Sequence, residues 1–342
     1  MGLYYGLIAL VGGLELAFRK IDVKDKRKCK LVIMYAATVL LQGLRAPTVG
    51  NDLKNYIYAL SLSREGAWTT PLMGFEIGFR MLLHLLSVLG ISEQVFIFLT
   101  AFICQAPIFY FIYKESTCFW ESLLIYYTFG MFTFSFSGIR QFLAMGIFLI
   151  AIVWLNEGKK RRFVLATILA STIHTSAIVG LIALPLSKTR IRQKGKLLLL
   201  GVFVIEMLFG RQLVSLAARL YGRSYSAVPT GAYSLFIMYV AIWTASVIFI
   251  DSEHPWSMYS NLILLGAMIQ GLGAYHASIG RVGYYFSVTL CVLIPHIIEK
   301  CSHNWSLKAL MHVMLIVFCL LFFYKNTGGG YLSVCPYVPF WK

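Results

Sequence analysis

The sequence has little charge and few acidic residues: 13% of its 342 residues are charged, and only 14 are Asp or Glu. Because a soluble domain carries about 25% charged residues, an ordinary soluble enzyme and a disordered protein are excluded. The seven cysteines are scattered, without a CxxC or a paired Cys/His spacing, so neither a zinc site nor a disulfide framework is indicated. Also missing are a Gly-rich phosphate loop, a GxSxG string and, in segments expected outside, a DxD pair or a two-histidine metal spacing.

Apolar residues are abundant instead: 59% of the chain is hydrophobic, and the mean hydropathy is +0.75. A bilayer crossing needs about 20 apolar residues. The apolar runs are too long for strands and do not alternate, so an all-α polytopic membrane protein is predicted. The clear runs cover about 3–18, 31–44, 95–113, 119–136, 139–155, 197–210, 232–250, 257–274, 282–298 and 308–324.

The formal charge of +16 is concentrated in short segments between these runs. Seven basic residues lie in 19–30, four in 156–162 and five in 187–196, as expected of cytoplasmic loops under the positive-inside rule. Nucleic-acid binding is therefore not expected, because no soluble domain remains to carry it. The first run has no basic residue before it, so we expect a retained helix with its N-terminus outside rather than a signal peptide.

Two further apolar runs, 73–90 and 163–186, decide the topology. If neither crosses fully, the three basic loops share the inside. We therefore predict about ten full spans and two partial elements, one at the outer surface and one re-entrant, which is tolerated where protein or a water-filled cavity covers it. The predicted organisation is one membrane domain over 1–326, with external loops at 45–94 and 211–231 and a short irregular external tail at 327–342.

The first polar motif is RAPTVGND at 45–52, followed by Tyr56. Pro47 and Gly50 predict a bent segment that leaves the membrane. Arg45 and Asp52 are interpreted either as a snorkelling side chain and a helix cap, or as an anion ligand and a carboxylate in one pocket.

The second motif, SFSGIRQF at 135–142, interrupts a long apolar stretch. It fits a polar turn between helices. It also fits an anion site, because the Arg140 guanidinium offers a planar fork of donors suited to phosphate, with Gln141 beside it.

Two more motifs carry titratable groups among apolar residues. STIHTSA at 171–177 places His174 and Ser176 in the partial element; His174 is either a satisfied buried histidine or a general base or donor. GRVGYYF at 280–286 places Arg281 beside Tyr285, which suits phosphate or sugar binding but also an interfacial aromatic belt.

Glu76, Arg80 and His84 follow one another at a spacing of four, on one face of a helix. They are either the internally paired polar face of a surface helix or a polar wall of a substrate groove. Arg211, Arg219 and Arg223 fall in the other outer loop, where a solvated face is the simpler interpretation. Arginines, carboxylates, one histidine and tyrosines without a metal motif suit an anionic lipid-linked substrate whose diphosphate is held by Arg, with no cofactor.

These motifs resemble the EpsG family of Wzy-like polysaccharide polymerases. The matching strings are LRAPTVGNDLKNYI at 44–57, GFEIGFRMLLHLL at 74–86, SFSGIRQFLAMGIFLIAI at 135–152, LASTIHTSAIVGLI at 169–182 and, more loosely, GRVGYYF at 280–286. They occur in the family's order. Asn51 stands where the family often has Thr, but Asp52 is kept.

The resemblance implies a helical architecture like that of C-type glycosyltransferases. It also implies a polymerase at the outer face of the bacterial cytoplasmic membrane. Such enzymes transfer a growing glycan from undecaprenyl diphosphate to the non-reducing end of a lipid-linked repeat unit. The products are capsule, exopolysaccharide or O-antigen, and the usual partners are a flippase and a chain-length regulator.

Residues and resemblance together give one hypothesis for the site. Arg140 and Arg45 hold the donor diphosphate, Arg281 holds the second carrier, and His174 or Asp52 takes the proton of the attacking hydroxyl. Glu76 and Arg80 line the groove, and sugars are positioned by Gln141, Ser176, Tyr56 and Tyr285. The alternatives are a polysaccharide ligase, a flippase or transporter for lipid-linked sugars, and a membrane acyltransferase built around His174. For the transporter, the sequence shows no inverted repeat and no mid-span carboxylate expected to couple ions.

Overall fold

The structure is a computed structural model that describes residues 1–21, 25–65, 74–189, 193–220, 233–250, 254–301, 304–328, 330 and 332–342. Throughout these ranges the regular elements are helices, and one isolated bridge joins Arg45 to Pro339. The predicted all-α class is confirmed. The chain divides into two compact units, 1–179 with 302–342, and 180–301.

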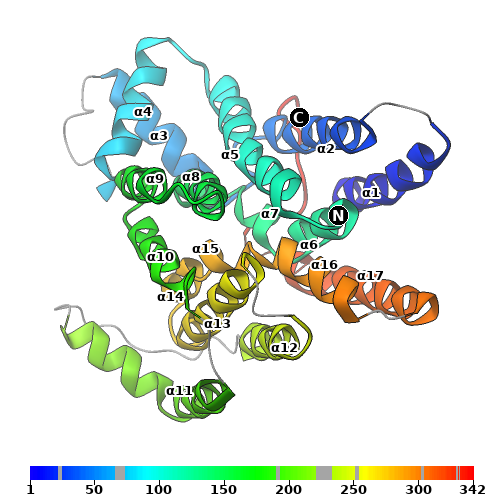
Figure 1. Cartoon of the computed structure of the whole chain (residues 1–342). Coiled ribbons are helices and arrows are strands. Elements are labelled where there is room, and N and C mark those ends of the chain that lie inside the picture. The colour runs from blue at the N-terminus through cyan, green and yellow to red at the C-terminus, as the bar shows by residue number, and fades with distance from the viewer. Residues whose placement is uncertain are drawn as a thin grey trace. The chain divides into compact units, whose positions relative to one another are not determined.

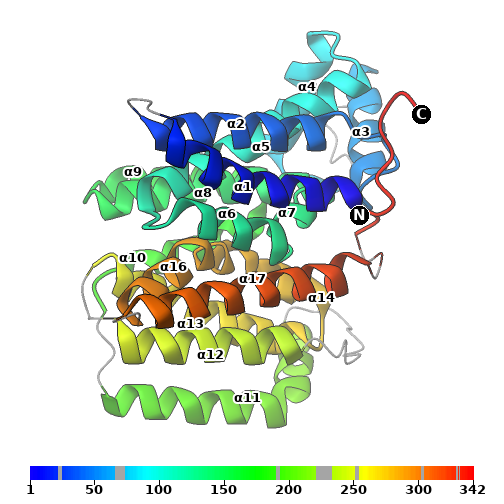
Figure 2. The same ribbon diagram turned by 90° about the vertical axis from the view of Figure 1, so that its right-hand side faces the viewer.

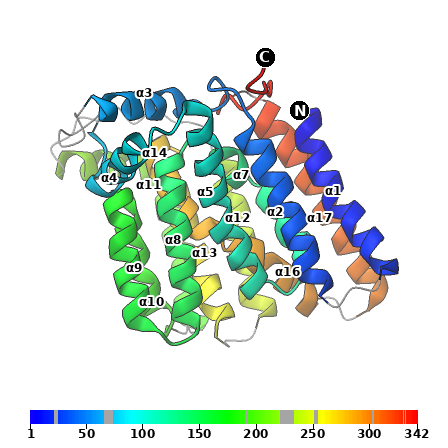
Figure 3. The same cartoon turned by 90° about the horizontal axis from the view of Figure 1, so that it is seen from above.

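The first unit holds the amino-terminal helices and the last helix of the chain (Figure 1). Its α-helices are α1 (Gly2–Lys20), α2 (Lys26–Gly43), α3 (Leu53–Arg64), α4 (Ile77–Val88), α5 (Glu93–Glu115), α6 (Phe119–Thr128), α7 (Met131–Phe134), α8 (Ile139–Asn156), α9 (Lys160–Ile173) and α17 (Trp305–Gly328). In Figure 3, α8 and α9 run side by side and α3 lies across their direction.

The second unit begins within the 3₁₀ helix η3 (Thr175–Ile182), which both units share. Its helices are α10 (Ala183–Leu186), α11 (Gln193–Leu220), α12 (Tyr233–Phe249), α13 (Trp256–Gly273), α14 (Ala277–Val282), α15 (Tyr284–Ser287) and α16 (Leu290–Cys301). Within it, α12 and α13 pack side by side (Figure 2). The predicted outer loop at 211–231 starts later than expected, because α11 continues to Leu220; residues 221–231 lie outside the described residues.

Long apolar helices indicate a membrane protein. Four of the described helices, α1, α5, α8 and α17, are long and apolar enough to cross a bilayer. A fifth crossing is possible if the bent pair Ser278–Ser287 and Leu290–Cys301, with 50° between its halves, is one span. The larger number of about ten spans and the C-type architecture stay predictions.

The predicted run 119–136 is broken rather than continuous. Helix α6 ends at Thr128, and Gly130 takes a left-handed φ of +85° before the short helix α7. Backbone groups freed at such a break need internal partners in an apolar setting. The Gln42 amide donates to the Ser135 carbonyl at 3.0 Å, and Gln105 donates to Gln42 at 2.6 Å. This buried polar network holds the segment that leads into α8.

The run 163–186 is also interrupted, at His174. Helix α9 ends at Ile173, and His174 has extended backbone (φ −149°, ψ 113°) before η3 begins. The break exposes the backbone N–H of Thr175 to side chains from elsewhere, because the first N–H groups of a new helix have no partner within it.

The carboxyl-terminal residues 332–342 form no helix and run back over the loop that follows α2 (Figure 2). Their backbone is tied to that loop at several points. The Ala46 N–H donates to Val338 at 2.8 Å, the Gly50 N–H to Ser333 at 3.0 Å and the Asn51 N–H to Leu332 at 3.2 Å. The tail therefore replaces water as the partner of this loop's backbone.

Candidate active site

Glu76 immediately precedes α4, at the N-cap position, but its side chain makes no cap hydrogen bond. The inner face of α4 is formed by Phe79, Leu83 and Leu86, which are buried at helical spacing. Gly78 allows α4 to approach α9 closely, since a Cβ there would lie 2.5 Å from the Thr172 Oγ1 and 2.8 Å from its carbonyl oxygen. This close approach brings Glu76 to the end of α9.

The Glu76 carboxylate joins three segments that are far apart in the sequence. Its Oε2 accepts a hydrogen bond from Arg140 Nη1, at the start of α8. Its Oε1 lies 3.1 Å from His174 Nδ1 and accepts from the Thr175 backbone N–H at 3.0 Å and from Thr175 Oγ1 at 3.2 Å. The Glu76 cluster is defined here as Glu76, Arg140, His174 and Thr175.

The cluster is only partly buried, so it is open to a substrate. The exposed fractions of the Arg140, Glu76 and His174 side chains are 20%, 17% and 24%. The Glu76 carboxylate therefore makes strong, charge-assisted hydrogen bonds and still remains accessible to solvent.

An aromatic wall supports the guanidinium of Arg140. Its Cζ lies 4.2 Å from the centre of the Phe75 ring and 6.0 Å from that of Phe79. Tyr56, from α3, packs against Phe75 and Phe79 at 5.7 and 5.5 Å and interacts with Arg140 through its hydroxyl. The Phe75 and Phe79 rings add a cation–π attraction to the guanidinium.

The pKa of the Glu76 carboxyl is held far below its ordinary value. Partial burial by itself would raise that pKa, but the hydrogen bonds from His174 and the Thr175 backbone and the charge of Arg140 outweigh burial and lower it to about 2. Glu76 is therefore ionised across the neutral range and does not take up a proton there.

Arg45 is placed differently from Arg140. It is fully buried, and its guanidinium lies 4.5 Å over the Phe136 ring. Its Nε and Nη1 have no hydrogen-bond partner, and no ion pair of Arg45 occurs in the part of the chain that the structure describes. Burial lowers the pKa of this group to about 10, which leaves it charged at neutral pH.

The loop that follows Arg45 packs directly on the segment before α8. Gly50 has φ +109°, and a Cβ at this position would lie 2.3 Å from the Phe136 carbonyl oxygen, so only glycine fits. Ser137 Oγ accepts from the Asn51 N–H at 2.9 Å and donates to the Leu332 carbonyl at 3.1 Å. Ser137 thus links this loop, the carboxyl-terminal tail and the approach to Arg140.

Asp52 occupies the N-cap position of α3, but its side chain makes no cap hydrogen bond. It acts electrostatically on Tyr56, one turn further along α3. Asp52 therefore borders the aromatic wall of the cluster through Tyr56, and its predicted role as an alternative base stays a prediction.

Five other predicted site residues lie outside the Glu76 cluster. Arg80 is one turn along α4 and is partly buried, Gln141 is buried beside Arg140 on α8, and Ser176 is partly buried in η3. Arg281, on α14, and Tyr285, fully buried on α15, belong to the second unit. Their substrate roles stay predictions.

Sequence reasoning missed Thr175, Phe75 and Ser137. Thr175 and Ser137 belong to the motifs at 171–177 and 135–142, so the sequence shows their polar character but not their partners. The expectation that no mid-span carboxylate couples ions stays a prediction. Glu121, on α6, and Glu206, on α11, lie inside predicted apolar runs and are only 2% and 5% exposed.

Comparison with known proteins identifies a family. The model of the EpsG family matches residues 29–338, nearly the whole chain, and this range contains the Glu76 cluster. No curated protein and no solved structure matches the chain.

Proposed function

Since the chain belongs to the EpsG family, we propose that it is a polysaccharide polymerase of the cytoplasmic membrane. It transfers a growing glycan from undecaprenyl diphosphate to the non-reducing end of a lipid-linked repeat unit at the outer face. The long apolar helices support the membrane location. The basic segments 19–30 and 156–162, placed inside, support the outward orientation of the opposite ends of α1 and α8.

The proposed base is His174. With its Nδ1–H donated to Glu76 at 3.1 Å, the other ring nitrogen, Nε2, carries the lone pair that accepts a proton. The acceptor hydroxyl oxygen attacks the anomeric carbon of the donor sugar while its proton passes to Nε2. The bond between that carbon and the diphosphate oxygen breaks, and the diphosphate leaves with the electron pair.

Glu76 and Arg140 have separate parts in this proposal. Glu76 is a positioning residue that fixes the orientation and tautomer of His174 and stabilises the imidazolium formed in the reaction, as an acidic partner does for a catalytic histidine. A guanidinium has five N–H donors, so the bond to Glu76 leaves Arg140 with donors for phosphate oxygens. Arg140 then stabilises the charge that grows on the leaving diphosphate, and no metal is required.

One observation carries the proposal: the Glu76 carboxylate binds Arg140 and His174 at the same time. The test is polymerisation by the purified protein in liposomes, supplied with its undecaprenyl-diphosphate-linked repeat unit and read as a glycan ladder on a gel. His174→Ala is expected to lower the rate by about 10²–10⁴, the usual contribution of a general base.

His84→Ala is the matched control, because His84 lies two turns beyond Glu76 on α4 and is partly buried like His174. It is expected to keep the rate within about threefold of wild type, because His84 is not part of the Glu76 cluster. Full activity of His174→Ala would remove it from the role of base.

Substrate accumulation separates the polymerase from the alternatives. In cells that lack the protein, single repeat units outside the membrane indicate a lost polymerase, and units trapped inside indicate a lost flippase. A ligase would instead transfer finished glycan to a terminal acceptor without extending it. Dependence on an acyl donor would indicate an acyltransferase.

A further inference from the structure

The packing of α8 against α9 leaves an apolar groove of about 360 Å³ in the first unit. The lining residues lie on one face of each helix, at spacings of three and four on α8 and with the adjacent pair Leu165 and Ala166 between Arg162 and Leu169 on α9. The lining residues are Ile147, Ile150, Trp154, Arg162, Leu165, Ala166 and Leu169. The groove wall is apolar except at the end where the two helices join.

That end carries a cation. Arg162 lines the groove there, exposed on the first turn of α9, and Trp154 lines the same end from α8. The connecting segment 156–162 has four basic residues and one acidic residue, a net charge of +3. The acidic residue, Glu157, is paired with Lys159 at 2.5 Å and also lies near Arg162. The end of the groove therefore keeps a positive charge.

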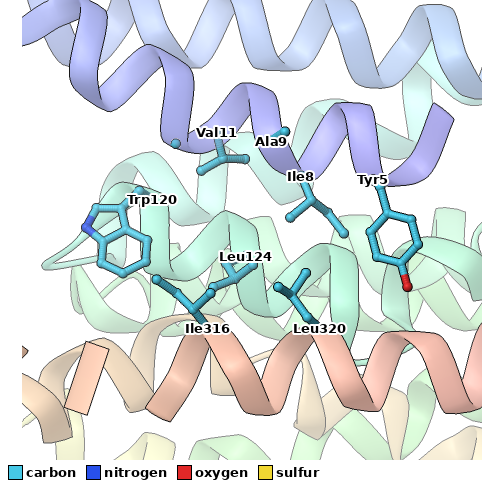
Figure 4. Close-up of a pocket in the computed structure, with 9 residues that line it drawn as sticks. Tyr5, Ile8, Ala9, Val11, Trp120, Leu124, Ile316 and Leu320 are labelled. Atoms are coloured by element: carbon cyan, nitrogen blue, oxygen red, sulfur yellow. The ribbon is translucent and has the colours of Figure 1, made fainter. Parts of the chain in front are cut away.

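A second groove of similar size provides a comparison within the same unit. It lies between α1, α6 and α17, with a volume of about 390 Å³, and Figure 4 shows Trp120 and Tyr5 at its opposite ends. Its described lining contains no charged side chain. This groove can hold any apolar chain, whereas the α8–α9 groove adds a feature that selects for a negative headgroup.

We propose that the α8–α9 groove binds one anionic glycerophospholipid, with an acyl chain along the apolar wall and its phosphate on Arg162. Basic pockets between helices on the cytoplasmic side of a membrane are typical sites for anionic headgroups. Trp154 lies two residues before the end of α8, and indole rings favour the interface between headgroups and acyl chains.

The charge distribution favours a phospholipid over the carrier lipid of the polymerase reaction. Arg140 begins α8 and Trp154 lies 14 residues later, about 21 Å along the helix at 1.5 Å per residue. A carrier whose diphosphate reacts at Arg140 would place no charge at Arg162. The cation of this groove therefore matches a headgroup of the opposite leaflet.

The experiment measures lipid binding, so its outcome is independent of the polymerase proposal. The full chain, purified in detergent, is titrated with dioleoyl-phosphatidylglycerol or dioleoyl-phosphatidylcholine. Retained lipid is counted by native mass spectrometry, and the melting temperature is followed. One phosphatidylglycerol is expected to bind in preference to phosphatidylcholine. Arg162→Gln is expected to weaken its retention about fivefold, the contribution of one basic side chain near an anionic headgroup.

Two variants serve as matched controls. Arg161→Gln removes the neighbouring exposed cation, which does not line the groove, and Gly12→Leu fills the groove of Figure 4. Both controls are expected to retain phosphatidylglycerol within twofold of wild type. A third variant, Leu169→Trp, fills the α8–α9 groove and is expected to lose the bound lipid. Equal losses in Arg161→Gln and Arg162→Gln would overturn the proposal. Displacement of phosphatidylglycerol by undecaprenyl phosphate to the same extent in wild type and in Arg162→Gln would also overturn the proposal.

Discussion

The sequence does not distinguish Arg140 from Arg45, since both lie in polar motifs beside apolar runs. Arg45 follows one such run, and Arg140 lies at the start of another. In the fold they differ in partner and access. Arg140 binds the Glu76 carboxylate and is 20% exposed, whereas Arg45 is fully buried against Phe136 with two of its nitrogens unpaired. The first guanidinium can reach a substrate and the second cannot without a movement of its surroundings.

This difference separates two kinds of arginine in one membrane protein. A partly exposed guanidinium with a carboxylate partner is ready to exchange or share donors with a phosphate. A buried guanidinium without a carboxylate is a source of local field and packing, and its desolvation is unfavourable to stability. The proposed chemistry therefore belongs to the Glu76 cluster, and for buried Arg45 we propose a structural part.

Among the variants that test this comparison, the largest effect is expected from Glu76→Gln, which keeps the shape of the side chain and removes its charge. The amide cannot hold Arg140 and stabilise protonated His174 together, so the polymerisation rate is expected to fall about 10²–10³-fold, with less effect on KM. Rates in proteoliposomes at saturating substrate measure this. A drop of less than tenfold, with the protein still folded, would give Glu76 the same structural status as Arg45.

Arg140→Lys is expected to have the next largest effect, about 10–100-fold on the rate. Lysine keeps the charge but lacks the planar fork that bonds Glu76 and lies over Phe75. The same assay measures the loss, and Arg64→Lys is the control, because Arg64 donates to the Ile91 carbonyl, outside the Glu76 cluster. Equal rates for Arg140→Lys and wild type would show that charge alone is sufficient at this position.

Ser137→Ala tests whether the tail and the loop position Arg140. Loss of its Oγ leaves the Leu332 carbonyl and the Asn51 N–H with one partner fewer. Expected are a loss of about 1–3 kcal/mol in the free energy of unfolding and a rate several-fold lower. Ser137→Thr, which restores the hydroxyl, should recover both. Failure of that rescue would favour a packing defect.

The acid dependence of stability should distinguish Glu76 from its glutamine variant. A carboxyl whose pKa falls from about 4.5 to about 2 on folding stabilises the protein fully above pH 4.5, and this contribution is lost as pH falls toward 2. Thermal melts should therefore show a difference in melting temperature between wild type and Glu76→Gln that does not narrow from pH 8 to 5 and narrows below 4.5. A difference that narrows already between pH 7 and 5 would contradict a lowered pKa.

The smallest effect on activity is expected from Arg45→Met. Replacing a buried ionic group by an apolar side chain of similar length is often neutral or stabilising, so the rate should stay within about threefold of wild type, the scale of most tolerated changes. Proteoliposome rates and melting temperature measure the outcome. A hundredfold loss of rate in a protein that melts normally would return Arg45 to the substrate site.

Parts of the site followed from the sequence. The sequence predicts His174, Arg140 and Glu76 as site residues, since ionisable groups are rare in apolar surroundings, and the structure brings Glu76 into contact with the other two. Their pairing does not follow from the sequence, which predicts Glu76 on a helix face with Arg80 and His84 and leaves Asp52 as an alternative base. A spacing of four shows which residues share a face, but not that a side chain at the N-cap turns away toward two other helices.

By itself the sequence determined the helical membrane class, the basic segments between spans and the motifs that interrupt the apolar runs, because composition and periodicity are local properties. Only the tertiary structure decided that Glu76 meets residues 64 and 98 positions away in the chain, and that Arg45 is buried while Arg140 stays accessible. Such contacts depend on how closely whole helices approach. At Gly78 and Gly50 the close approach requires the absence of a side chain, and the sequence does not show which segment lies opposite each glycine.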